Sequence, residues 1–109
     1  MRKERAQAIM ETIEKEVSDK LSKWKPTNRY FNGSRLQVGW HYKHTYLSIV
    51  IHYREYKEGI SVTINGPDGV TQRDWRGMSA EIGEKAIEKS INFAKDIEED
   101  DDHEILSSR

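Results

Sequence analysis

The feature that most constrains the fold is an alternation of apolar and polar residues between Arg35 and Asn65. Three runs within it place large apolar side chains at every second position. These residues are Leu36, Val38, Trp40 and Tyr42 in the first run, Leu47, Ile49, Ile51 and Tyr53 in the second, and Ile60, Val62 and Ile64 in the third. A period of two, rich in β-branched and aromatic residues, is typical of half-buried strands. We therefore predict strands near 35–43, 46–56 and 59–65, joined as an antiparallel meander.

The same alternation predicts how these strands pair. With a first turn at residues 44–45, Trp40 lies opposite Ile49. In the second hairpin, Tyr53 lies opposite Val62. Both registers place every large aliphatic side chain except Val50 on one face of the sheet, and a slip of one residue would destroy that agreement.

Two helical patterns flank the predicted strands. Residues 3–24 carry apolar side chains at spacings of three and four, and residues 80–98 do the same after an N-cap at Ser79. Residues 26–34 are expected to form a connecting loop, because they contain proline, asparagine and glycine. Residues 70–72 are a further candidate for a short fourth strand.

These elements predict an α+β fold with the order α-β-β-β-α, in which both helices cover one face of a three-stranded sheet. We assign residues 1–100 to a single α+β domain and residues 101–109 to a flexible acidic tail. The residues expected in the core are Trp24, Trp40, Ile49, Ile51, Val62, Ile82 and Phe93.

Charge is unevenly distributed along the chain, although its net value is only -1. Residues 1–57 carry +6, residues 58–78 carry -1 and residues 79–109 carry -6. The absence of cysteine excludes disulfides and thiolate chemistry and favours a cytoplasmic location. No segment approaches the ~20 apolar residues of a membrane span, so no membrane partner is expected.

The order of helix, three-stranded meander and helix is also that of the double-stranded-RNA-binding domain. Residues 77–79, a glycine, a methionine and a serine before the last helix, are similar to a segment of that family. The positions of the family's lysines hold Ala80, Glu81 and Glu84 here. The resemblance therefore implies a shared architecture without the family's grip on RNA duplexes, which depends on positive charge.

No residue pattern indicates catalysis, a cofactor or a metal. The sequence contains no phosphate-binding loop and no nucleophile elbow, and its helix carboxylates alternate with lysines as on a solvated surface. His41 and His52 share a predicted sheet face but lie too far apart along it to hold one ion. We therefore predict that the protein is not an enzyme.

The sheet face opposite the helices is the most informative surface, because nothing else in the chain is left to cover it. It is rich in tyrosine, histidine and arginine, which are common in binding surfaces, although a solvated sheet face is the equal alternative. The predicted binding residues are Lys43, Tyr46, His52, Arg54 and Tyr56. A second candidate surface is acidic and consists of Glu81, Glu84, Glu88, Glu98 and Glu99.

Two functions remain open at this point. The first is a small interaction protein that binds and inhibits or regulates a larger protein. In general style it is similar to phage-encoded inhibitors, including some anti-CRISPR proteins, which combine such a core with an acidic flank that mimics nucleic acid. The alternative is binding of a nucleotide or nucleic acid on the basic and aromatic sheet face. A homodimer is compatible with both.

Overall fold

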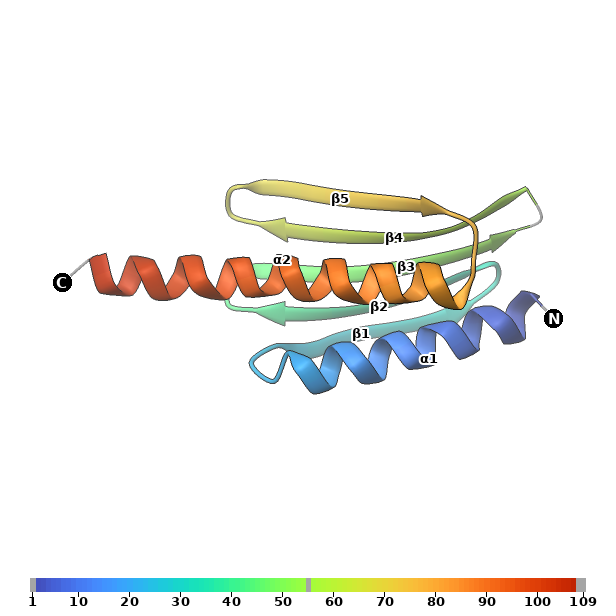
Figure 1. Cartoon of the computed structure of the whole chain (residues 1–109), viewed down its shortest axis with the longest axis horizontal. Coiled ribbons are helices and arrows are strands. Elements are labelled where there is room, and N and C mark those ends of the chain that lie inside the picture. The colour runs from blue at the N-terminus through green and yellow to red at the C-terminus, as the bar shows by residue number, and fades with distance from the viewer. Residues whose placement is uncertain (1, 55, 108–109) are drawn as a thin grey trace.

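The computed structural model describes residues 2–54 and 56–107, with only the backbone described at residue 32 and at residues 101–107. Within these residues the chain forms one five-stranded antiparallel sheet and two helices, α1 (Arg2–Lys20) and α2 (Ala80–Ser107). The strands are β1 (Lys25–Asn32), β2 (Arg35–Tyr42), β3 (Thr45–Arg54), β4 (Lys57–Gly66) and β5 (Gly69–Arg76). They lie in the sheet in chain order (Figure 1). The α+β class is confirmed, whereas the prediction of three strands is wrong.

The two strands that the sequence did not predict as full elements are the edges of the sheet. β1 replaces the predicted loop and contains Pro26, whose missing N–H group is tolerated on an edge strand. β5 is exposed along almost its whole length and carries Arg73 and Asp74. Charged side chains are typical of edge strands, where they discourage pairing with other chains. Edge strands therefore lack the apolar alternation by which the central strands are recognised.

The registers predicted for both hairpins are wrong, but by an even number of residues. Trp40 pairs with Leu47, and Tyr53 pairs with Glu58. The first turn therefore falls at residues 43–44, where Lys43 adopts a positive φ of 53°. An even shift leaves each side chain on its predicted face, because successive residues of a strand point to opposite sides.

Both helices pack on the same face of the sheet, as predicted, and run in the same direction (Figure 1). Five of the seven predicted core residues are buried, while Ile82 and Phe93 are only partly buried. Small residues on α2 explain this difference, since the line of α2 that lies closest to its neighbours contains Ala86, Ser90 and Ala94. Ile82 and Phe93 therefore flank the line of closest contact.

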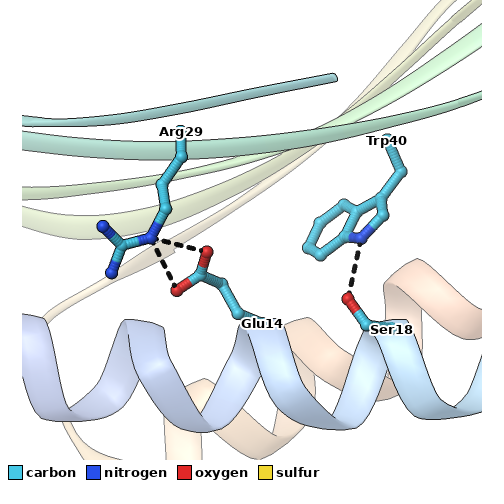
Figure 2. A network of polar contacts seen from close by, with 4 residues as sticks. All are labelled: Glu14, Ser18, Arg29 and Trp40. Carbon is cyan, nitrogen blue, oxygen red and sulfur yellow. Dashed lines mark hydrogen bonds and ion pairs between the residues drawn. The ribbon is translucent and has the colours of Figure 1, made fainter. Parts of the chain in front are cut away.

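Polar contacts fix α1 across β1 and β2 (Figure 2). The indole Nε1 of the buried Trp40 donates a hydrogen bond to Ser18 Oγ at 3.0 Å. Arg29 Nε lies 3.0 Å from Glu14 Oε2, and its guanidinium carbon lies 3.8 Å from the centre of the Phe31 ring. The first contact joins α1 to β2, and the ion pair of Arg29 with Glu14 joins α1 to the edge strand β1.

The helix bounds differ from those predicted. α1 ends at Lys20 instead of Trp24, and α2 continues to Ser107, so that it extends past the end of the sheet (Figure 1). The backbone of residues 101–107 is thus helical, while residues 108–109 lie outside the described residues. The flexibility of this acidic segment and the division at residue 100 stay predictions. Among the described residues, neither helix contains an apolar stretch that could cross a membrane.

Candidate functional site

The helices leave the opposite side of the sheet uncovered, and we call this side the open face. Paired residues of antiparallel strands point to the same side, so the open face consists of rows of side chains across the sheet. A middle row consists of Tyr30, Gln37, Val50, Ser61 and Asp74. The next row toward the β3–β4 turn consists of Arg35, His52, Gly59 and Arg76. Arg54 and Lys57 pair beyond it.

The five predicted binding residues do not form one cluster. Tyr46 and His52 lie on the open face but six positions apart on β3, which is about 20 Å. Lys43 lies in the β2–β3 turn, beyond Tyr46. Arg54 and Tyr56 lie at the opposite end with His52, and Tyr56 is 95% exposed.

His41 and His52 do not lie close to each other either. His41 pairs with Tyr46, so it lies at the end of the sheet remote from His52. Among the residues that the structure describes, no group of three or more metal-ligating side chains is found.

Tyr46 has a role inside the sheet. Its hydroxyl donates a hydrogen bond to Asn28 Oδ1 at 2.8 Å, so the side chain reaches from β3 across β2 to β1. It passes directly above Gly39, where a Cβ atom would overlap the tyrosine hydroxyl. Tyr46 thus ties the edge strand to the centre of the sheet.

The end of the open face beside the β3–β4 turn is strongly basic. We call Arg35, Arg54, Lys57 and Arg76 the basic cluster, and all four are exposed. In the described part of the chain, none of them forms an ion pair with a carboxylate. The sequence predicted only one of these four. Arg76 was missed because β5 was not predicted. Arg35 could have been found, because it alternates with Leu36 on a predicted strand and therefore points to the open face.

Neutral groups hold two of these arginines in place. Arg54 Nε donates to Ser34 Oγ at 2.7 Å, and Arg35 Nη2 donates to Gln37 Oε1 at 2.8 Å. Neither bond cancels the positive charge, so the guanidinium groups keep most of their attraction for an anion.

His52 lies at the centre of the basic cluster. Its partial burial, followed by the positive charges of Arg35, Lys57 and Arg54, lowers the pKa of this imidazole below the usual 6.5. Beside it lies Gly59, where a Cβ atom would be 2.8 Å from the Trp75 carbonyl oxygen. A side chain at this position would therefore collide with the backbone of β5, which explains the glycine in this row between His52 and Arg76.

Asp74 is the one acidic residue of the open face among the described residues. Hydrogen bonds from the side chains of Ser61 and Gln72 lower the pKa of its carboxyl, and the Gln72 bond measures 2.9 Å. Asp74 is therefore held as a carboxylate. The open face also carries the four cations of the basic cluster and Lys25 at its far end, so its net charge is positive.

The predicted acidic surface lies on α2, in the helical layer. Glu81, Glu84, Glu88 and Glu99 are exposed on it. Glu98 does not belong to this surface, because it is only 6% exposed and lies 3.4 Å from Lys95 Nζ. The molecule therefore presents a basic sheet face on one side and acidic side chains along α2 on the other.

No family model, no curated protein and no solved structure matches the chain. The fold and the surface together define a small α+β protein with a single sheet, two helices on one side and a basic open face on the other.

Proposed function

We propose that the protein is a non-enzymatic binding protein that holds single-stranded nucleic acid on its open face. One observation carries the proposal: among the described residues, this face has five Lys or Arg side chains and a single Asp. Nucleic-acid binding depends chiefly on neutralising phosphates with such cations. Within the described residues, the cations of the basic cluster form no ion pair, so they offer that neutralisation without first breaking one.

The neighbouring side chains favour a single strand over a duplex. Tyr30 and Tyr56 are 50% and 95% exposed, and both lie close to the rows that hold the basic cluster. Unpaired bases stack on exposed aromatic rings with little dependence on sequence. The middle row also offers the amide nitrogen of Gln37, whose oxygen accepts from Arg35, and this nitrogen can donate to base edges.

The acidic side chains of α2 support binding on the open face instead of on the helices. The start of α2 carries Glu81 and Glu84, which repel phosphates where the RNA-duplex family has lysines. A nucleic-acid strand is therefore attracted to the open face and repelled from α2 on the other side, although the net charge of the protein is close to zero.

The test is a titration of a fluorescently labelled single-stranded oligonucleotide, followed by anisotropy at several salt concentrations. Arg35→Gln combined with Arg54→Gln should weaken binding and reduce the slope of log K against log salt by about 1.4, since each lost phosphate contact removes about 0.7. The matched control, Lys15→Gln combined with Lys85→Gln, removes the same charge from the two helices and should leave the slope unchanged. Equal losses in both double variants would contradict the proposal.

A second proposal is the inhibitor or regulator of a larger protein, in the style of phage-encoded inhibitors. It is supported by the exposed carboxylates of Glu84, Glu88 and Glu99 on α2, which extends past the sheet (Figure 1). A protein of this kind would bind no oligonucleotide and would instead compete with one for a basic partner. The same titration therefore separates the two proposals. A homodimer and a cytoplasmic location stay predictions.

A further inference from the structure

A cavity of about 530 Å³ opens at the same end of the sheet as the basic cluster. The start of α1, the β3–β4 turn and the end of β5 meet there (Figure 1). Its lining consists of Arg2, Tyr56, Lys57, Glu58, Arg76 and Gly77. This volume lies within the range of sites that bind small molecules, about 300–1,000 Å³.

The cavity continues the positive surface of the open face. Lys57 and Arg76 belong both to its lining and to the basic cluster. The third cation, Arg2, is neutralised, because its Nε lies 2.9 Å from Glu58 Oε1. Two cations in the lining therefore have no carboxylate partner among the described residues, and their charge favours an anion in the cavity.

We infer that this cavity receives the terminal phosphate monoester of a strand that lies on the open face. The inference rests on the proposed function and names the part of the ligand that this end of the site recognises. A terminal monoester carries a charge of about -1.5 to -2, against -1 for a phosphate within the strand, so it gains more from Lys57 and Arg76.

The position of the cavity also favours a terminal phosphate. The cavity lies where the sheet ends beside the β3–β4 turn, so a nucleic-acid strand that runs over the open face toward this turn can end in it, whereas an internal phosphate must continue in both directions. Tyr56, almost fully exposed at the cavity, is placed to stack on the terminal base.

The experiment compares three oligonucleotides of one sequence, with a 5′-phosphate, a 3′-phosphate or hydroxyl groups at both ends. One phosphorylated strand should bind the wild-type protein about fivefold more tightly than the hydroxyl strand, because each exposed charge pair contributes less than a factor of ten. Lys57→Gln combined with Arg76→Gln should abolish this preference. Lys25→Gln, at the far end of the open face, should weaken all three strands alike.

A gain of function provides a second readout. Glu58→Gln removes the carboxylate from the cavity and releases Arg2, so the preference for the phosphorylated strand should increase. Equal affinities of the wild-type protein for all three strands would overturn the inference and leave the proposed function standing. Failure of every strand to bind would overturn both.

Discussion

Gly39 is a residue whose identity is set by a neighbouring side chain. The Tyr46 hydroxyl occupies the position that a Cβ atom of residue 39 would take, and it bonds to Asn28 there. A glycine at this point of a central strand otherwise costs stability, since alanine is favoured there by about 0.5–1 kcal/mol. The close approach of the tyrosine is the physical reason for the exception.

We therefore predict that Gly39→Ala destabilises the protein by about 1 kcal/mol, because the new methyl group displaces Tyr46 from Asn28. In a Tyr46→Ala background the same substitution should cost clearly less, because only the end of the Asn28 side chain, 2.6 Å from that position, still has to move. Urea denaturation of the four proteins in this double-mutant cycle measures both effects. An equal cost in the two backgrounds would contradict the close approach.

His52 gives the protein a dependence on pH whose sign follows from its surroundings. Partial burial and then the charges of Arg35, Lys57 and Arg54 lower its pKa below 6.5 in the folded state. On acidification the unfolded chain therefore takes up the proton first, so the contribution of neutral His52 is present above pH 6.5 and lost as the pH falls through the folded pKa. Between about pH 7.5 and 5.5, the wild-type protein should lose more stability than His52→Gln.

A bound phosphate should act on the same histidine in the opposite direction. Its negative charge favours the imidazolium form and raises the pKa of His52, so the complex binds more protons than the free protein. Affinity for a single strand should therefore rise as the pH falls, and this rise should be smaller in His52→Gln. Parallel pH profiles of the two proteins would show that the strand does not approach His52.

At the scale of elements, α1 is held to the sheet partly by a hydrogen bond from the buried Trp40 to the hydroxyl of Ser18 on this helix (Figure 2). Ser18→Ala leaves the indole N–H without this acceptor and should reduce the free energy of unfolding by about 1 kcal/mol. Ser22→Ala is the matched control, since Ser22 is exposed just beyond α1 and should change stability by less than about 0.5 kcal/mol. Equal values from chemical denaturation would contradict the role of the bond.

The elements also show which parts of the fold the sequence can predict. The three central strands were found because their apolar faces are buried under helices, and burial produces the period of two. β1 and β5 bury little of their surface, so polar residues such as Asn28 and Gln72 are tolerated in them and no alternation remains. Their existence follows from pairing with a neighbouring strand, which no local pattern records.

The alternation of the central strands also predicted part of the candidate site. Parity placed His52 and Arg54 on the open face, and shifts of an even number of residues cannot change that assignment. The separation of Tyr46 from His52 follows from their six positions on one strand, whereas the pairing of Arg35 with His52 depends on the exact turn and was not available from the alternation. Arg76 required a strand that the sequence did not predict.

At the scale of the whole molecule, the fold separates charges that the sequence only divides along the chain. The open face receives four cations of residues 1–57, which are Lys25, Arg35, Arg54 and Lys57, and β5 adds Arg76 to them. In the helical layer, α2 carries the exposed acids Glu81, Glu84, Glu88 and Glu99. A net charge of -1 thus describes neither surface.

The central claim, that the open face is the binding surface, is tested most directly by NMR chemical-shift mapping with a single-stranded oligonucleotide. We predict that the largest backbone amide shifts fall on the rows that contain Val50 and His52, together with the side-chain resonances of Arg35 and Arg54. The amides of α2 around Glu84 and Glu88 should change little. Shifts concentrated on α2, with the β3 and β4 amides unchanged, would contradict the account.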